Sequence, residues 1–287
     1  MSLIYNRENS QVYESVTYKS GALKFLYNNK VGRMALKVAV CPFVSKTYGK
    51  YNNSKISTRK IGKFIKDNEI DLSEYENKNY KSFNEFFTRK KANLSFDKNE
   101  NSFISPADSK LTAYKITKDL SVNIKNSIYT INELLEDKLD YENYKDGSCL
   151  VFRLSVDDYH RYCFIDNGIV KRVKKIKGKL HTVSPISQEH KVYSQNSRVC
   201  SFIDTQNFGE IIYIEVGALM VGRIVNHNLT NFKKGQEKGY FEFGGSTIVI
   251  LTDSSIKIDD DILEQSKKGI ETQVYYGERI GEKIIRQ

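Results

Sequence analysis

The chain has 287 residues and a mass of 33.1 kDa, with 39% hydrophobic and 12% aromatic residues. This composition excludes a disordered chain, and three prolines without any low-complexity tract exclude a stalk or a collagen-like protein. The net charge of +10 is compatible with nucleic acid or with an anionic membrane as a partner.

The positive charge is concentrated in the first 66 residues. This segment contains thirteen Lys and Arg residues but only Glu8 and Glu14, which gives a net charge of +11. Residues 67–287 therefore carry a net charge of −1. The basic character belongs to one end of the chain.

Two stretches of this basic segment, 21–27 and 31–45, have apolar residues at helical spacing. Pro42 should end or kink the second helix. Apolar faces beside lysines suit a helix that packs on its own domain, and they also suit a helix that lies in a lipid interface. These residues alone favour the packed helix.

The sequence has no segment that we expect to span a bilayer. The longest candidate, 211–222, has 12 residues and includes Glu215, whereas about 20 apolar residues are required. The N-terminus lacks the apolar core of a signal peptide, so we expect an intracellular protein. The four cysteines are scattered without a C-x-x-C pair, which predicts neither a zinc site nor a disulfide framework.

Helices are predicted up to about residue 90 and strands beyond residue 100. Ser57 or Thr58 is a candidate cap for a helix that follows, and three phenylalanines share one face of a helix in 81–88. A capping box at Thr130 and Glu133 predicts one further helix. Alternating or β-branched runs predict strands at 111–116, 150–154, 159–165, 169–173, 211–216 and 247–251. The predicted fold is α+β, with a helical basic part (1–90) before a mainly β catalytic part (100–287).

Three residues are candidates for chemistry, each on a weak local signal. Ser246 follows two glycines before an apolar strand, which is typical of a simple turn but also of a serine that attacks the preceding peptide bond or an external substrate. Its surroundings are not the G-x-S-x-G elbow of hydrolases. His160 is a natural acid or base near neutral pH, although a lone strand histidine is more often structural. Asp108 is a loop carboxylate that would orient a histidine placed beside it.

In combination and order, these signals are specific. The chain resembles the pyruvoyl-dependent phosphatidylserine decarboxylases along nearly its whole length. The resemblance rests on five blocks: Phe-Asn-Glu-Phe-Phe-Thr-Arg at 83–89, Ser-Pro-Ala-Asp at 105–108, Asp-Tyr-His-Arg at 158–161, Val-Gly-Ala-Leu-Met-Val-Gly at 216–222, and Lys-Gly-Tyr-Phe-Glu-Phe-Gly-Gly-Ser-Thr at 238–247.

The resemblance implies a proenzyme that cuts itself between Gly245 and Ser246. The products would be a β chain of residues 1–245 and an α chain of residues 246–287, whose first residue becomes a covalent pyruvoyl group. This group would be the cofactor, an electron sink for decarboxylation of phosphatidylserine to phosphatidylethanolamine, and no metal is expected. By the same resemblance, Asp108 and a histidine form a relay with Ser246 for the cut, and His160 protonates the substrate Cα.

One departure from the family pattern affects the relay. The family commonly shows His-Arg-x-His, whereas this chain has His160-Arg-Tyr-Cys163. His181 stands where relatives usually have an aromatic residue. Our hypothesis is that His181 replaces the missing histidine; the alternative is that His160 does both jobs.

The resemblance also favours the membrane interpretation of the basic segment. The expected partner is phosphatidylserine in an anionic membrane surface, with the enzyme peripheral on the cytoplasmic face of the cell membrane and its β and α chains forming a heterodimer. Nucleic acid is not expected, because the positive charge is confined to the helical end and no RNA-binding signature is present. Two other classes stay open: a serine hydrolase with an intact chain, and a basic membrane- or RNA-binding module without catalysis.

Overall fold

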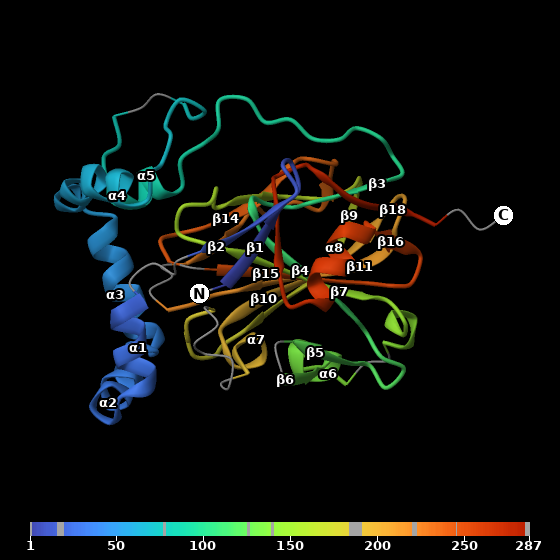
Figure 1. The fold of residues 1–287 in the computed structure, drawn as a ribbon, viewed down its shortest axis with the longest axis horizontal. Coiled ribbons are helices and arrows are strands. Elements are labelled where there is room, and N and C mark those ends of the chain that lie inside the picture. Colours follow the sequence, from blue (N-terminus) through green and yellow to red (C-terminus); the bar gives the residue numbers. More distant parts are fainter. Residues whose placement is uncertain are drawn as a thin grey trace.

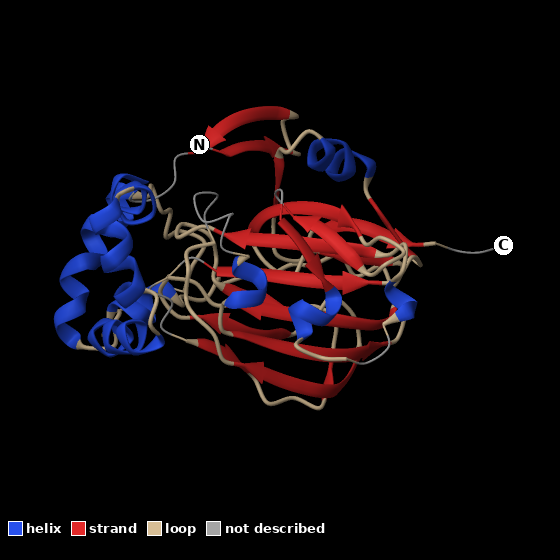
Figure 2. Cartoon of the chain, turned by 90° about the horizontal axis from the view of Figure 1, so that it is seen from below, coloured by secondary structure: helices blue, strands red, loops and turns tan. Residues whose placement is uncertain are grey.

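A large β-sheet with helices gathered at one end forms the framework of the protein (Figures 1 and 2). The structure is a computed structural model that describes residues 2–15, 20–76, 79–124, 127–138, 141–183, 191–219, 223–244 and 246–284. No helix in these parts of the chain is long and apolar enough to cross a membrane.

The main sheet has ten strands, and neighbouring strands are antiparallel except for β17 and β1. From one edge to the other, its strands are β13 (Asn231–Phe232), β9 (Gly168–Ile176), β10 (Arg198–Thr205), β11 (Gly209–Val216), β15 (Ser246–Thr252), β7 (Ser148–Leu154), β4 (Ser109–Lys115), β17 (Glu271–Val274), β1 (Ser2–Asn6) and β2 (Gln11–Ser15).

The central strand β15 is buried on both faces. Ile248 and Ile250 belong to one hydrophobic core, and Val249 and Leu251 belong to a second core on the other side of the sheet. A strand covered on both faces needs apolar residues at every position, which explains the continuous run of β15.

Three small sheets and several short helices cover the main sheet. The small sheets are β12 (Ile224–Asn226), β14 (Glu237–Phe241) and β8 (Arg161–Cys163); β16 (Ile256–Ile258), β18 (Arg279–Lys283) and β3 (Ser102–Ile104); and β5 (Ser121–Ile124) with β6 (Ser127–Thr130). The covering helices are α6 (Ile131–Leu135), the 3₁₀ turn η2 (Glu142–Tyr144), α7 (Val192–Gln195) and α8 (Asp260–Lys267).

The N-terminal helices stand together at one side of the sheet (Figure 1). They are α1 (Ser20–Asn28), α2 (Lys30–Ala39), α3 (Pro42–Asn52), the 3₁₀ turn η1 (Lys55–Lys60), α4 (Ile61–Asp67) and α5 (Phe83–Phe87). The Asn29 side chain accepts hydrogen bonds from the first turn of α2, which separates that helix from α1. Gly32 permits a close approach, since a Cβ there would lie 1.9 Å from the Phe25 carbonyl oxygen.

The structure confirms the α+β class and most of the predicted elements. The capping box of Thr130 and Glu133 is formed, and Pro42 marks a break, because α2 ends at Ala39 and Pro42 begins α3. The predicted cap at Ser57 or Thr58 is wrong: η1 covers both residues, and α4 begins after Lys60 without a side-chain cap.

The first strands of the chain were not predicted. Residues 2–15 form the β1–β2 hairpin, so the N-terminal helices occupy residues 20–87. β1 pairs in parallel with β17, a strand more than 260 residues later in the chain. The N-terminus therefore belongs to the main sheet.

Candidate active site

The candidate residues gather at one end of the central strands. β15 begins where β7 ends, since Ser246 pairs with Leu154. β4 also begins at this end, because Lys110 pairs with Arg153, the residue before Leu154. Two strand spacings separate β4 from β15, which puts the start of β4 about 10 Å from Ser246. Asp108 immediately precedes β4.

Ser246 is fully buried, and its Oγ has no hydrogen-bond partner among the described residues. A buried polar group without a partner costs about 1–3 kcal/mol. Gly244, two residues before it, has a φ of +138°, which a residue with a side chain rarely adopts. Gly245, the other side of the expected cleavage site, lies outside the described residues. A buried hydroxyl without a partner, beside a turn that requires glycine, is typical of a reactive site.

The upstream side of the glycine turn is held by the N-terminal helices. The Phe243 ring packs at 5.0 Å from the rings of Phe83 and Phe87 on α5, and Phe64 of α4 completes the buried cluster. The Phe243 N–H donates to Asn84 Oδ1 at 3.1 Å. The sequence analysis missed this role of Asn84, although the residue stands inside the first matching block.

His160 is buried beside the same aromatic cluster. Its ring lies 4.1 Å from the Phe87 ring, between centroids, and its Nδ1 lies 2.8 Å from the Asp158 carbonyl oxygen. A carbonyl only accepts, so Nδ1 carries the hydrogen and Nε2 carries the lone pair. Nε2 has no hydrogen-bond partner in the described parts of the chain. Burial lowers the pKa of His160 to about 3, so the imidazole is neutral at pH 7.

The loop that carries His160 is fixed by a buried ion pair. Lys110 Nζ donates to both carboxylate oxygens of Asp158, at 2.7 and 2.8 Å, and the Ser155 N–H donates to Oδ2 at 2.6 Å. Burial raises the pKa of the Asp158 carboxyl to about 6, which leaves it ionised at neutral pH. The sequence analysis missed Lys110, for which the pattern holds no signal.

Asp108 is buried and already bonded. Its Oδ2 accepts from Lys91 Nζ at 2.8 Å, and its Oδ1 accepts from the Tyr276 N–H at 2.8 Å. It lines a cavity of about 300 Å³ with Lys91, Lys110 and Asp158. In this arrangement the carboxylate bonds a lysine and a backbone amide instead of a histidine.

Cys163 lies against the loop that precedes Asp108. Its N–H donates to the Pro106 carbonyl at 2.9 Å, and its thiol lies 4.0 Å from the Ser105 carbonyl oxygen. Burial raises the pKa of the Cys163 thiol to about 12, so it stays protonated and is no base at neutral pH. The position that holds the second histidine of the family motif is therefore near Asp108 but carries an inert group.

His181 lies at the same end of the sheet, on the other side of Ser246. β11 ends beside β15, since Val216 pairs with Thr247, and the Leu219 N–H after β11 donates to the His181 carbonyl at 3.2 Å. The His181 Nδ1 lies 3.2 Å from the Tyr27 hydroxyl of α1. The two imidazoles therefore come from different segments: His160 follows β7 in the chain, whereas His181 follows β9 and is bonded by the segment after β11.

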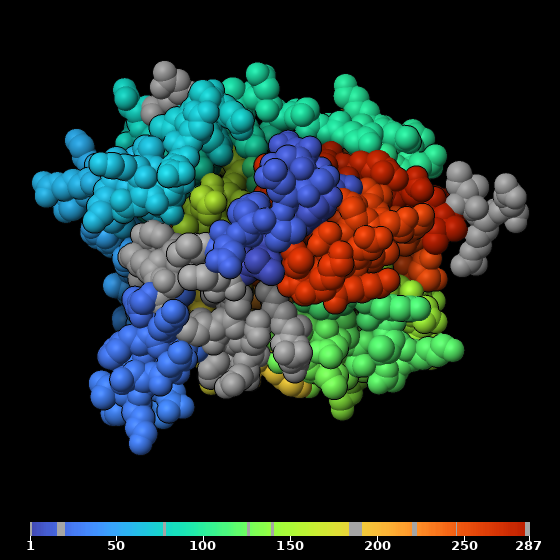
Figure 3. Space-filling view, viewed as in Figure 1, coloured from blue at the N-terminus to red at the C-terminus, as the bar shows by residue number. Residues whose placement is uncertain are grey.

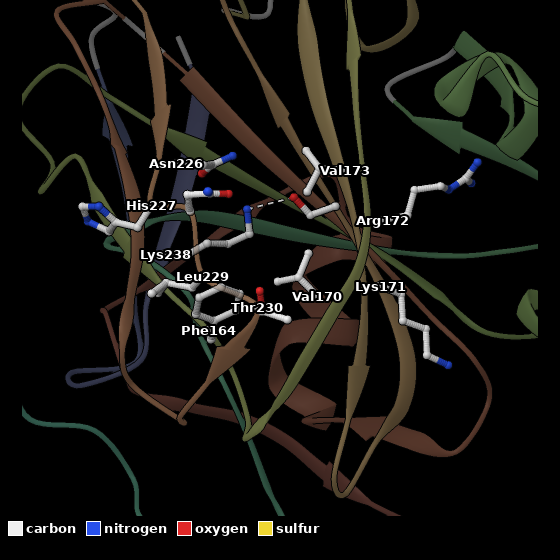
Figure 4. Close-up of a pocket in the computed structure, with 12 residues that line it drawn as sticks. Phe164, Val170, Lys171, Arg172, Val173, Asn226, His227, Leu229, Thr230 and Lys238 are labelled. Carbon is white, nitrogen blue, oxygen red and sulfur yellow. Dashed lines mark hydrogen bonds between the residues drawn. The ribbon is translucent and has the colours of Figure 1, made fainter.

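A pocket of about 220 Å³ between β9 and the β12–β14 hairpin is separate from this site (Figure 4). At its base the Lys238 ammonium donates to the Ser201 hydroxyl at 3.0 Å, as the dashed line shows, and to Glu215 at 2.6 Å. Neither Ser246 nor any candidate histidine or aspartate lines it. The candidate residues lie instead at the end of the central strands.

Comparisons with known proteins agree on one family. The sequence model described as phosphatidylserine decarboxylase matches residues 83–282. A relative from Clostridium acetobutylicum, named phosphatidylserine decarboxylase proenzyme 2, is 56% identical over 97% of this chain and 98% of its own. Phosphatidylserine decarboxylase proenzymes of Clostridium botulinum (strain Alaska E43) and Clostridium tetani are 40% and 42% identical, each over 99% of this chain and at least 99% of their own.

Proposed function

The chain belongs to the phosphatidylserine decarboxylase family, and we propose that Ser246 is the residue from which it makes its pyruvoyl group. The enzyme removes the serine carboxylate of phosphatidylserine as CO₂ and leaves phosphatidylethanolamine. It is made as a proenzyme that generates the pyruvoyl group from its own chain. The observation that supports Ser246 is its buried hydroxyl without a partner, at the start of a central strand and after a turn in which Gly244 has a positive φ.

Self-cleavage converts the peptide bond before Ser246 into a new chain end. Ser246 Oγ attacks the Gly245 carbonyl carbon, a C–O bond forms, and the C–N bond breaks as the Ser246 nitrogen gains a proton. Loss of the Ser246 Cα proton then expels the Gly245 carboxylate, which leaves dehydroalanine at the start of residues 246–287. Water replaces the nitrogen as ammonia is released, and the terminal residue becomes pyruvoyl.

His160 is our proposed base for the first step. Its neutral Nε2 has a free lone pair, so it can take the Ser246 hydroxyl proton and return it to the leaving nitrogen. His181, the hypothesis from the sequence, becomes the alternative, supported by its bond to the segment after β11 and by its contact with Tyr27. Asp108 accepts hydrogen bonds from Lys91 and from the Tyr276 N–H. A relay from Asp108 through a histidine to Ser246 therefore requires a rearrangement that breaks one of these bonds.

The surroundings of Ser246 fit a pyruvoyl group. When present, this group withdraws the electron pair that remains on Cα after CO₂ leaves. Burial of Ser246 keeps water away from the position that the group would occupy. His160, beside Phe87, is our proposed acid for the proton that replaces CO₂ on Cα. Because the resting imidazole is neutral, its Nε2 must first take up that proton from solvent.

The two products of cleavage stay together as a heterodimer in our proposal. The α chain supplies β15, which lies between β11 and β7, and β17, which lies between β1 and β4. Arg7 of the β chain also bonds Asp259, Asp261 and Glu278 of the α chain at 2.6–2.9 Å. Figure 3 shows the N-terminal hairpin (dark blue) against the C-terminal segment (orange and red).

Residues 1–90 contain the proposed membrane-contacting region, and residues 100–287 contain the catalytic domain. On α2 and α3, the side chains of Val31, Met34, Val38 and Phe43 are exposed, with Met34 at 71% and Phe43 at 78%. Apolar side chains beside Lys and Arg suit a helix that lies in the headgroup region of an anionic bilayer. This favours a peripheral position at the membrane surface.

The intact mass of the purified protein tests the cleavage proposal. We expect two chains, residues 1–245 and 246–287, and a blocked N-terminus on the shorter chain. Ser246→Ala should remain a single chain of 33.1 kDa without decarboxylase activity. An uncut wild-type chain with decarboxylase activity would exclude the pyruvoyl origin at Ser246, and an uncut chain with esterase activity would indicate a serine hydrolase.

Vesicle sedimentation tests the membrane proposal. Replacing both Met34 and Val38 by Gln should weaken binding to vesicles that contain phosphatidylserine by at least tenfold, because burying each apolar side chain contributes about 1.5–3 kcal/mol. Ile128→Gln, an exposed apolar residue on β6, is the matched control and should bind normally. Equal binding of the double variant would exclude α2 as the contact.

A further inference from the structure

A second basic surface lies outside the N-terminal helices. Between residues 168 and 179, β9 and the segment after it carry six Lys and Arg residues and no acidic residue. We propose that the part nearest the active site, Lys175, Lys177 and Lys179 (the β9 lysine patch), binds the anionic headgroups of a phosphatidylserine-containing bilayer. This inference rests on the proposed membrane-bound function and adds a second contact to it.

The three basic residues at the far end of β9 pair with two carboxylates, which leaves a net charge of +1 there. Lys171 lies 3.0 Å from an Asp204 carboxylate oxygen, and Arg172 lies 3.0 Å from Asp137, between nitrogen and oxygen. Lys174 lies 3.9 Å from the same Asp137. These pairs leave little free charge at that end.

The three lysines of the patch differ in this respect. All three are exposed, and none of them forms an ion pair with another residue in the described part of the chain. They occupy alternate positions, so an extended backbone directs their side chains to one side. The positive charge of this segment is thus concentrated at one end of β9.

That end is the active-site end of the sheet. Ile176 pairs with Arg198 on β10, and Arg198 pairs with Val216 on β11, which lies beside the start of β15. The Leu180 N–H, directly after the patch, donates to the Val40 carbonyl at the end of α2 at 3.0 Å. The β9 lysine patch therefore continues the surface that α2 presents to the membrane.

Lipid headgroups fit this patch better than nucleic acid does. Lysines on flexible stems interact with anionic headgroups as separate charges and need no fixed geometry. Single-stranded nucleic acid binds where aromatic side chains stack on its bases, and residues 171–179 include no aromatic residue. The substrate headgroup carries a net negative charge and the product headgroup carries none, so this contact should weaken as the enzyme consumes its substrate.

Vesicle binding by the full-length protein tests the patch. Replacing Lys175, Lys177 and Lys179 together by Gln should weaken binding to phosphatidylcholine vesicles with 30% phosphatidylserine on the order of 100-fold, since each basic residue at an anionic surface contributes about fivefold. Wild-type binding should fall comparably when phosphatidylethanolamine replaces the phosphatidylserine. The triple variant should still decarboxylate a short-chain, monomeric phosphatidylserine at the wild-type rate.

The matched control removes three positive charges elsewhere. Lys115, Lys171 and Lys257 are exposed and paired with nearby carboxylates on other parts of the surface. Their triple Gln variant should bind vesicles within a few-fold of wild type. Equal loss in both variants would show a net-charge effect and overturn the patch.

Two further outcomes separate this inference from the proposed function. If the wild type binds the vesicles and the patch variant binds equally well, the patch is wrong and the α2 contact stands. If the wild type does not bind them, both membrane proposals are wrong, while cleavage at Ser246 is unaffected. Loss of RNA binding in the patch variant, with vesicle binding retained, would assign the surface to nucleic acid.

Discussion

His160→Gln should nearly abolish self-cleavage without unfolding the protein. The variant removes the Nε2 lone pair that we propose accepts the Ser246 proton. A positioned general base contributes about 10²–10⁴ in rate, or about 3–5 kcal/mol of barrier. The Gln amide can still donate to the Asp158 carbonyl, and a hydrogen bond of this kind is worth about 1 kcal/mol, so the fold should survive.

The pH dependence of wild-type cleavage gives a second measure of the same residue. Burial holds the pKa of His160 at about 3, so the neutral, basic form predominates from pH 5 to 8. A solvent-exposed histidine with a pKa near 6.5 would be about 97% protonated at pH 5, and its contribution would fall about 30-fold. We therefore expect His160 to contribute no loss of cleavage rate between pH 8 and pH 5.

Conversion of freshly synthesised precursor into two chains, followed by gel electrophoresis at each pH, measures both quantities. His227→Gln is the matched control, because this histidine is half-exposed, bonds Glu237 and should cleave normally. If His160→Gln cleaves at the wild-type rate and His181→Gln does not cleave, the base is His181. A 30-fold fall of the wild-type rate between pH 8 and pH 5 would refute the buried neutral imidazole.

Three further predictions concern the framework. Gly32→Ala places a Cβ 1.9 Å from a carbonyl oxygen of α1 and should destabilise the protein by about 1–3 kcal/mol in thermal unfolding. Gly62→Ala, whose Cβ would have nothing within 4 Å, should not destabilise it, and equal melting temperatures of the two variants would contradict the close helix contact. Lys238→Met leaves Glu215 buried without its cation and should lower the free energy of unfolding in urea by about 3–5 kcal/mol. The loss should be smaller in the double variant with Glu215→Leu, and an unchanged unfolding midpoint of Lys238→Met would argue against the ion pair. Cys163 should resist iodoacetamide at pH 7 in the native protein, as measured by mass spectrometry, and fast alkylation would contradict its burial.

Local sequence rules predicted much of the framework. The capping box at Thr130 depends on two residues three positions apart, and β15 is a continuous apolar run, so both can be read without tertiary information. The β1–β2 hairpin could not be read in this way. Its residues are mostly polar and half-exposed, and β1 becomes a strand because β17 lies beside it.

The candidate site residues could be proposed from the sequence as a set, but their contacts could not. The matching blocks indicated Ser246, His160 and Asp108. The hydrogen bond that fixes the His160 tautomer and the bond between Lys91 and Asp108 depend on how distant segments pack, which the spacing of residues does not encode. The structure brings His160 and Ser246 to one end of the sheet without bonding their free atoms.

The proposed cut lies at the start of a strand, where the protein would be able to break its own chain and keep its fold. Downstream of the cut, Ser246 and the rest of β15 are held by hydrogen-bonded ladders to β7 and β11, which do not involve the broken bond. Upstream, Phe243 is held separately by Asn84 and by the aromatic cluster on α5. Because each side has its own anchor, the bond between Gly245 and Ser246 can break with movement confined to the glycine turn. In our proposal, the residue that makes the cut becomes the group that acts on the lipid.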